Sequence, residues 1–272
     1  MPDTDDTAPG PPAHGALGPG ADPEDHRRAA ELAAAAGQLL VDLRAELVAA
    51  GADAATLKAE GDRRSHEWLM EQLAAVQRDG DGVLSEEGSD DRARLERHRV
   101  WIVDPLDGTR EFSEPSRRDW AVHVALAIDG RPAAGAVALP ALGLTLATDP
   151  PATLAPPHGG APRVIVSRSR PPAAATWLAD QLDGELVEMG SAGAKAMAVV
   201  RGEADVYAHS GGQYEWDSCA PVAVALAAGL HATRLDGSPL RYNEPEPYLP
   251  DLLICRPELA EAALAALGDF PG

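Results

Sequence analysis

The stretch RVWIVDPLDGT, residues 99–109, joins a short apolar segment to two aspartates and a glycine. Its β-branched and aromatic residues predict a strand over residues 99–103. We expect that strand to end at the following Asp-Pro pair, because proline cannot donate a hydrogen bond to a neighbouring strand. The turn after it can direct Asp104 and Asp107 toward one point, with the carbonyl of Leu106 between them.

These oxygens suit a magnesium ion, which prefers a few carboxylates together with phosphate and water. Gly108 and Thr109 are expected to begin a helix, whose free backbone amides suit a phosphate oxygen. The alternative is a solvated turn in which Thr109 caps that helix. The spacing of the residues leaves both interpretations open.

Further acidic residues stand at the ends of predicted elements. Glu86 and Glu87 follow a short apolar segment, and adjacent side chains of an extended chain point in different directions, so one can bind a metal while the other supports it. Asp217 precedes an apolar helix, where an aspartate is more often a cap than a ligand. Asp62 can equally cap a helix that begins near Arg64. Each has a structural interpretation beside the functional one.

Other reactive residue types fit no catalytic pattern. Cys219 is expected to be a small buried residue, because no basic partner stands beside it in the sequence. His123 and His209 lack the spacing of metal ligands and are interpreted as surface or core residues. The sequence contains no serine–histidine–aspartate pattern, Walker loop or dinucleotide fingerprint.

The rest of the chain predicts mixed helical and β layers. Residues 1–24 are rich in Pro and Gly and are expected to form a disordered tail. The segment 150–162 is the best boundary between an N-terminal α+β half, residues 25–150, and a C-terminal α/β half, residues 151–272. We predict helices over residues 25–51, 64–76, 172–182, 192–200 and 220–228, a hairpin of strands 120–128 and 134–139, and strands at 83–84, 164–166 and 204–207.

Composition narrows the classes of partner. The 272 residues are 45% hydrophobic and carry a formal net charge of −20, which disfavours nucleic-acid polymers and anionic membranes. A small anionic substrate remains compatible, because a divalent cation can reverse the local potential. The two cysteines, the acidic N-terminus and the short apolar stretches predict a cytoplasmic protein without a signal peptide or membrane span.

Taken together, the motifs resemble the inositol monophosphatase superfamily of metal-dependent phosphatases. The match is to three separated motifs in the same order, Ser85-Glu86-Glu87, Asp104 to Thr109, and Trp216-Asp217 with Cys219-Ala220-Pro221. The longer run DPLDGTREF, ending at Phe112, is similar to the CysQ branch, the 3'(2'),5'-bisphosphate nucleotidases. The resemblance covers residues 30 to 256.

The resemblance implies a layered α-β-α-β-α sugar-phosphatase fold with the site between the two halves. It implies two magnesium ions, with a third site left open, held by Glu86, Asp104, Asp107, Asp217 and the Leu106 carbonyl. It assigns catalytic roles to Asp107 and to Thr109 with Asp62, the last two of which position the attacking water. It assigns phosphate binding to the backbone amides of Gly108 and Thr109. It assigns the substrate pocket to Gly190, Ser191, Ala192 and Lys195, and packing behind Asp217 to Trp216.

The expected reaction is hydrolysis of the 3'-phosphate of 3'-phosphoadenosine 5'-phosphate to AMP, by attack of water without a covalent intermediate. By the same resemblance Arg110, Lys195 or Arg241 can meet the second phosphate, whereas the favoured interpretation of any single one of them is an ordinary basic residue of the surface. A phosphatase of inositol 1-phosphate or fructose 1,6-bisphosphate is the alternative enzyme, and a catalytically silent metal- or nucleotide-binding scaffold is the alternative of another class. Both monomer and homodimer remain open.

One departure from the family concerns the segment before Asp62. Relatives usually place a longer loop between a lysine and this aspartate, whereas Lys58 and Asp62 are only four residues apart here. A shortened loop is therefore expected at this point.

Overall fold

The computed structural model describes residues 15–271, which form two five-stranded sheets. The first sheet has the order β1-β2-β3-β4-β5. Its strands are β1 (Gly82–Ser85), β2 (Arg99–Asp107), β3 (Ala121–Ile128), β4 (Arg131–Leu139) and β5 (Leu144–Ala147). β1 pairs with β2 in parallel, and the remaining neighbours pair antiparallel.

The second sheet has the order β7-β6-β8-β10-β9. Its strands are β6 (Arg163–Ser167), β7 (Glu185–Met189), β8 (Val206–Tyr214), β9 (His231–Thr233) and β10 (Tyr248–Cys255). β6 pairs in parallel with β7 and β8, and β10 pairs antiparallel with β8 and β9.

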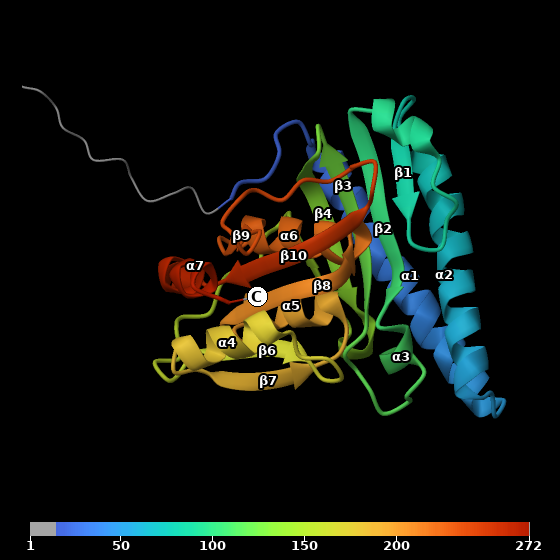
Figure 1. Cartoon of the computed structure of the whole chain (residues 1–272). Coiled ribbons are helices and arrows are strands. Elements are labelled where there is room, and N and C mark those ends of the chain that lie inside the picture. Colours follow the sequence, from blue (N-terminus) through green and yellow to red (C-terminus); the bar gives the residue numbers. More distant parts are fainter. Residues whose placement is uncertain (1–14, 272) are drawn as a thin grey trace, which may run out of the picture.

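Helices separate and cover the two sheets, which gives five layers (Figure 1). The outer layer on the first sheet contains α1 (Pro23–Ala49) and α2 (Ala54–Val76). The middle layer contains α5 (Ala192–Val200) and α6 (Glu215–Ala227), and the outer layer on the second sheet contains α4 (Ala173–Gln181) and α7 (Ala260–Gly268). Short helical turns complete the chain: α3 (Thr109–Phe112), η1 (Arg92–Glu96), η2 (Pro140–Leu142) and η3 (Pro257–Leu259). The predicted α-β-α-β-α fold is confirmed.

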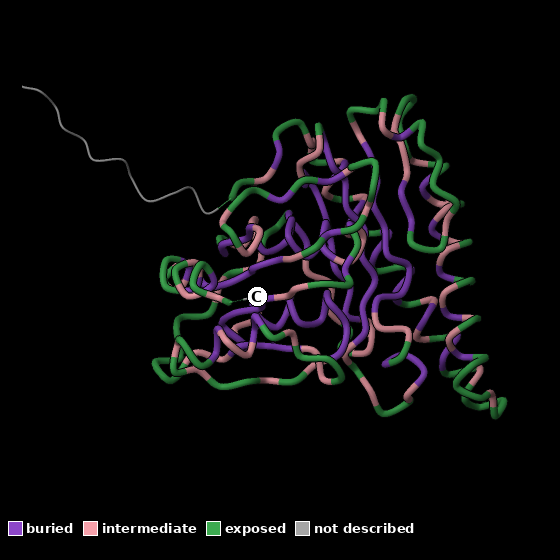
Figure 2. Tube along the Cα trace, viewed as in Figure 1, coloured by how far each residue is buried: buried purple, intermediate pink, exposed green. Residues whose placement is uncertain are grey.

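The central strands of the first sheet, β2 to β4, are buried except at the first residues of β2 and β4 (Figure 2). An antiparallel sheet usually alternates apolar and polar residues because one face meets water. Here α1 packs on one face of β3 and β4 and α6 packs on the other, so every residue of β3 is buried. These two interfaces form separate apolar cores, and a third lies between the second sheet and α4 with α7.

Several predicted boundaries differ from the structure. The predicted disordered tail, residues 1–24, extends too far along the chain. α1 already begins at Pro23 with Asp22 as its cap, and the amide of Gly18 donates to the carbonyl of Pro132. Residues 1–14 of that predicted tail lie outside the described residues. α2 begins at Ala54, with Asp53 as its cap, rather than near Arg64. The expected shortened loop is therefore continuous helix.

The C-terminal half also contains elements that sequence patterns do not reveal. β7 is a short edge strand, ELVEM, whose two exposed glutamates interrupt its apolar residues, so it gives only a weak strand pattern. β10 contains Pro250, and the pairing with β8 shifts register between Leu249 and Asp251 around it. Proline is tolerated in a strand at such a bulge, but it obscures the strand in the sequence.

No helix among residues 15–271 is long and apolar enough to cross a membrane. Cys219 and Cys255 are both buried, and neither forms a disulfide bond. The interpretation of Cys219 as a small buried core residue is confirmed.

Candidate metal and phosphate site

A β-bulge brings the two aspartates of the central motif to one side of β2. Contrary to prediction, β2 does not end at the Asp-Pro pair but continues to Asp107. Asp104 pairs with His123 on β3 and Asp107 pairs with Ala121, so β2 has one extra residue between these points. Side chains alternate along a strand, and residues three apart would face opposite sides. The extra residue restores Asp107 to the side of Asp104.

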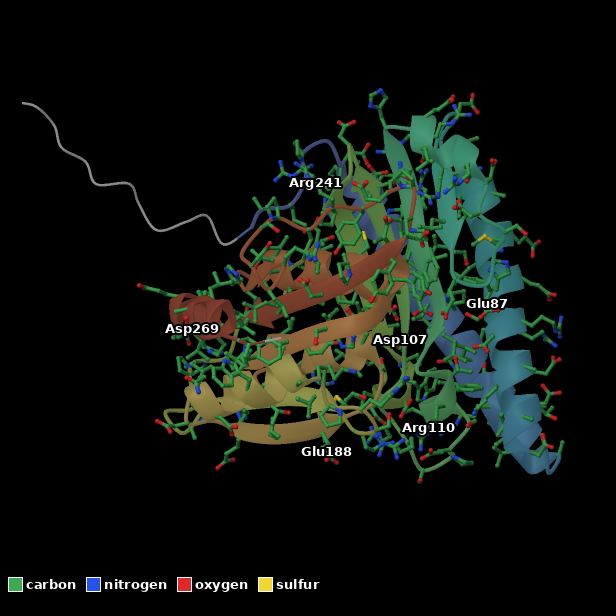
Figure 3. All side chains as sticks on the ribbon, in the orientation of Figure 1. Glu87, Asp107, Arg110, Glu188, Arg241 and Asp269 are labelled. Carbon is green, nitrogen blue, oxygen red and sulfur yellow. The ribbon has the colours of Figure 1, made fainter. Side chains whose placement is uncertain are left out.

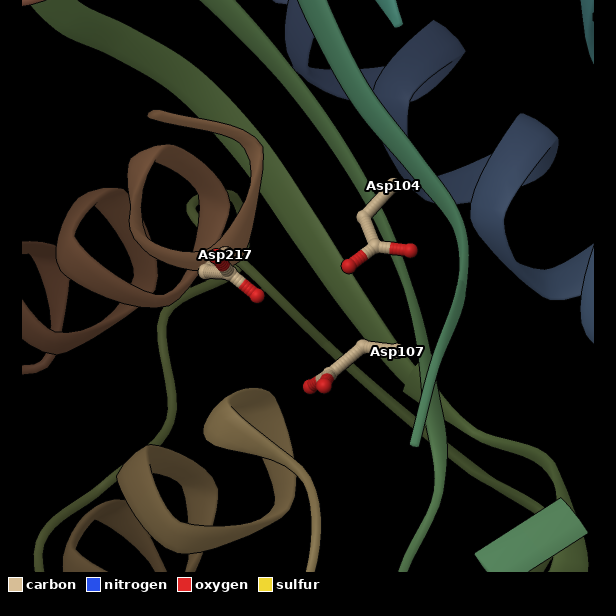
Figure 4. Close-up of side chains that lie close together, drawn as sticks. All are labelled: Asp104, Asp107 and Asp217. Atoms are coloured by element: carbon tan, nitrogen blue, oxygen red, sulfur yellow. The ribbon is translucent and has the colours of Figure 1, made fainter. Parts of the chain in front are cut away.

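Asp217 reaches the same point from the middle helical layer (Figure 4). It is the third residue of α6, and its Oδ2 accepts a hydrogen bond of 2.7 Å from the amide of Tyr214. The interpretation that Asp217 helps to cap α6 is therefore confirmed, but this hydrogen bond occupies only its Oδ2 and leaves Oδ1 available. Asp104, Asp107 and Asp217 each offer an oxygen within 4.8 Å of the others. Strands and helix together build a three-carboxylate cluster.

Burial and mutual repulsion make this cluster electrostatically unfavourable without a cation. Burial, together with Glu86 and Asp107, raises the pKa of Asp104 well above its usual range. Burial and Asp107 raise the pKa of Asp217 to about 7. Glu86 follows β1, and although the residue is exposed as a whole, desolvation of its carboxyl and repulsion from Asp217 raise its pKa to about 7. A bound divalent cation would relieve this repulsion.

Asp107 differs from its neighbours because the start of α5 surrounds it with donors. Ser191 Oγ donates to Oδ2 at 2.5 Å, the amide of Gly193 donates to the same oxygen at 2.6 Å, and the amide of Ala192 donates to Oδ1 at 3.1 Å. Burial would raise the pKa of Asp107, but His123 and these donors outweigh it and lower the pKa to about 2. Asp107 is therefore ionised over the physiological range.

His123 is buried beside this cluster, so the sequence-based interpretation as a core residue is only part of its role. Its Nε2 lies 3.2 Å from Asp107 Oδ2, and its Nδ1 lies 2.9 Å from the carbonyl of Trp216. Burial would lower the pKa of His123, but Asp107 raises it overall. Ligand spacing along the chain could not reveal this residue, because its neighbours come from other elements. Its place opposite Asp104 follows from the β2–β3 pairing, which only the structure reveals.

Thr109 and Asp62 form a second polar pair at the edge of the cluster. Thr109 Oγ1 lies 3.0 Å from Asp62 Oδ1 and 3.2 Å from the carbonyl oxygen of Leu106. Gly108 precedes it with a φ of 86°, a conformation that favours glycine. Desolvation raises the pKa of Asp62 to about 6, although Thr109 opposes the shift. Asp62 lies inside α2 rather than at a helix cap.

A cavity of about 460 Å³ lies beside the start of α5. Gly190 and Ser191, two of the predicted pocket residues, line it, whereas Ala192 does not. The remaining lining residues are mostly basic or hydroxylic: Arg110, Glu111, Ser167, Arg168, Ser169 and Arg170. Sequence reasoning missed the arginines of the loop after β6. The available signal was the alternation of serine and arginine directly after an apolar strand.

The three basic residues expected to meet a second phosphate lie in different places. Arg110 lines the cavity, and Figure 3 shows it below Asp107 while Arg241 lies above it. Arg241 lines a separate apolar cavity with residues of the N-terminal segment and β9. Lys195 is buried, and its Nζ donates to the carbonyl of Ser191 at 2.6 Å. Only Arg110 of the three borders the cavity beside Ser191.

The carboxylate cluster predicts how pH and metal affect stability. Carboxyls whose pKa is higher in the folded protein than in the unfolded chain destabilise the fold as pH rises from about 4 toward about 7. We expect the Tm of the metal-free protein to fall between pH 5 and pH 8, and added Mg²⁺ to raise Tm more at pH 8. Differential scanning fluorimetry with EDTA or Mg²⁺ measures this, with Glu86→Gln expected to flatten the slope. A metal-free Tm independent of pH contradicts the prediction.

The fold and the site define a class: a two-sheet α/β protein with a buried acidic cluster suited to divalent metal ions. The chain belongs to the inositol monophosphatase family, whose sequence profile matches residues 22–149 and 164–269. This family is metal-dependent, and the predicted resemblance is confirmed.

Individual relatives narrow the comparison. A 3'-phosphoadenosine 5'-phosphate phosphatase of Mycobacterium bovis is 54% identical over 243 residues, covering 86% of this chain and 90% of the relative. The 3'(2'),5'-bisphosphate nucleotidase CysQ of Escherichia coli is 30% identical over 199 residues, covering 69% of this chain and 80% of the relative. The crystal structure of CysQ from Bacteroides thetaiotaomicron matches with a TM-score of 0.69 and 26% identity, covering 86% of this chain and 97% of that chain.

Proposed function

We propose that this protein is a magnesium-dependent phosphatase that converts 3'-phosphoadenosine 5'-phosphate into AMP and phosphate. The observation that carries the proposal is that the arginine-lined cavity adjoins the carboxylate cluster through Ser191, which lines the cavity and donates to Asp107. Metal ions held by the cluster would bind the phosphate that is hydrolysed, and the arginines would bind a second phosphate on the same molecule. The 54% identical Mycobacterium bovis relative, named for this substrate, supports the same reaction.

The donor set fits magnesium, because all the side-chain ligands are hard oxygen donors. We propose that Glu86, Asp104, Asp107, Asp217 and the Leu106 carbonyl hold two ions. When bound, magnesium neutralises charge on the phosphoryl and leaving oxygens and lowers the pKa of nearby water.

Thr109 and Asp62 are proposed to position the attacking water. The Thr109 hydroxyl donates to the Asp62 carboxylate, so its lone pairs can accept a hydrogen bond from the attacking water and orient it. The amides of Gly108 and Thr109, at the start of α3, have no acceptor within the helix and can bind phosphate oxygens. The water oxygen attacks phosphorus and gives up one proton to the Asp62 carboxylate by way of the Thr109 hydroxyl. The bond from phosphorus to the ribose 3'-oxygen breaks, that oxygen takes up one proton from solvent to complete AMP, and inorganic phosphate leaves.

Arg110 and Arg170 are proposed to bind the 5'-phosphate. Both line the cavity and both residues are exposed. Arg168 is held by Glu111, whose Oε1 accepts a hydrogen bond of 2.9 Å, so we assign it to fixing the loop. Lys195 is buried and its Nζ donates to the carbonyl of Ser191. We therefore propose that Lys195 supports the pocket by holding Ser191 and does not contact the 5'-phosphate.

Three substrates test the proposed function directly. Phosphate release with Mg²⁺ should be compared for 3'-phosphoadenosine 5'-phosphate, inositol 1-phosphate and fructose 1,6-bisphosphate as kcat/KM. A strong preference for the nucleotide is expected. Comparable rates, or a preference for a sugar phosphate, would support the broader phosphatase instead. No release from any of them would support a catalytically silent scaffold.

The arginine assignment makes a separate prediction. Arg170→Ala should raise KM for 3'-phosphoadenosine 5'-phosphate about tenfold, the usual cost of losing one charge-assisted hydrogen bond. Hydrolysis of adenosine 3'-monophosphate, which lacks the 5'-phosphate, should change little. Arg241→Ala is the matched control and should leave both substrates unaffected. If Arg170→Ala raised KM equally for both substrates, Arg170 would not bind the second phosphate.

The proposed substrate class is a small phosphorylated metabolite, and the proposed compartment is the cytoplasm. The two unpaired buried cysteines are compatible with a reducing compartment.

A further inference from the structure

We propose, resting on the metal site proposed above, that His123 is a positioning residue that fixes the carboxylate of the proposed ligand Asp107 beside the helix that carries Asp217. The two ligands belong to different elements, β2 and α6, which meet only through tertiary packing. His123 extends from β3 between them. It therefore acts on the metal site through Asp107, without being a ligand itself.

The contacts of the imidazole span this gap. Nδ1 lies 2.9 Å from the carbonyl of Trp216, the residue before Asp217, and a carbonyl can only accept, so Nδ1 donates. Nε2 lies 3.2 Å from Asp107 Oδ2. The ring is fully buried, and Nδ1 is 4.0 Å from Asp104 Oδ2. One side chain thus contacts the helix of one ligand and the carboxylate of another.

Gly193 shows how closely the surroundings fit this ring. A Cβ placed on Gly193 would lie 2.0 Å from His123 Nε2. The amide of the same glycine donates to Asp107 Oδ2, so the start of α5 approaches Asp107 and His123 together. A side chain at residue 193 would have to displace the imidazole. The absence of a side chain there allows His123 and α5 to reach the same carboxylate.

Two substitutions that each replace only one ring nitrogen by an amide nitrogen separate positioning from simple packing. In His123→Asn the amide nitrogen replaces Nδ1, which keeps the Trp216 contact and loses the Asp107 contact. In His123→Gln the amide nitrogen replaces Nε2, which keeps the Asp107 contact. His231→Asn is the matched control, because His231 is also buried but lies on β9, where its Nε2 bonds to Thr233 Oγ1 at 2.9 Å.

The measurement is the Kd of Mg²⁺ for the full chain by isothermal titration calorimetry, with the metal-free Tm of each variant. We expect His123→Asn to weaken Mg²⁺ binding about tenfold or more, the usual effect of losing a group that orients a ligand. His123→Gln should stay within about threefold of the wild type, as should His231→Asn. Wild-type affinity in His123→Asn overturns the proposal. So do equal losses in the Asn and Gln variants.

Gly193→Ala tests the proposal independently of those variants. We expect it to weaken Mg²⁺ binding by displacing the imidazole. Combined with His123→Asn, whose shorter side chain leaves room for the methyl group, it should weaken binding no further than His123→Asn alone. Contacting residues that act through one interaction are expected to be non-additive in this way. Additive losses in the double variant, or normal affinity in Gly193→Ala, overturn the proposal.

Discussion

Replacing Asp107 by Asn is expected to lower kcat/KM for 3'-phosphoadenosine 5'-phosphate on the order of 10³-fold, comparable with the largest losses of single preorganised electrostatic groups. The substitution keeps the shape of the side chain but removes the negative charge from the three-carboxylate cluster. The amide also presents hydrogens toward the start of α5, where Ser191, Ala192 and Gly193 already donate. Both the metal and the surrounding donors therefore lose a partner.

The measurement should be made at saturating Mg²⁺ and accompanied by the Kd of the metal. Asp129→Asn is the matched control, because Asp129 lies in the β3–β4 turn at a φ of 50°, which asparagine adopts readily. The control should retain wild-type activity and metal affinity. Near-normal turnover in Asp107→Asn with saturating metal would exclude Asp107 as a ligand.

Replacing Asp62 by Asn is expected to lower kcat about 10²-fold, the lower range for loss of a positioned proton acceptor. An asparagine can donate to Thr109 Oγ1, so the threonine hydroxyl no longer has to point toward residue 62. Its lone pairs are then no longer held toward the attacking water. Asp62 lies outside the three-carboxylate cluster, so the Kd of Mg²⁺ should change only a few-fold.

Asp53→Asn provides the control on the same helix. Asp53 caps α2 through the amide of Thr56, and asparagine caps a helix about as well as aspartate. This variant should therefore retain both rate and stability. Loss of metal affinity in Asp62→Asn as large as in Asp107→Asn would assign Asp62 to metal binding rather than to the water.

The sequence predicts the acidic site because its motif is local. Asp104, Leu106, Asp107 and Thr109 lie within one strand and the turn after it, and their residue types alone specify oxygen ligands and a phosphate-binding helix start. The expectation that β2 would end at the Asp-Pro pair was wrong, because pairing with β3 absorbs one extra residue as a bulge. Such pairing depends on a partner strand and leaves no local signal.

Residues that are separated along the chain were harder to assign. Arg168 and Arg170 gain significance only because the loop after β6 lies beside α3 and the start of α5. Lys195 and Arg241 looked equivalent to Arg110 in the sequence, yet one is buried against Ser191 and the other lines a different cavity. Charge is a property of the sequence, whereas access to a substrate depends on packing.

The sequence by itself determined the family, the layered α/β class and the acidic residues suited to metal ions, since these depend on residue type and short-range order. Only the tertiary structure decided which oxygens converge, which arginines border the cavity and that His123 lies between Asp107 and α6. The physical reason is that a metal site is assembled from several elements. Their relative positions are set by sheet pairing and helix packing between residues far apart in the chain.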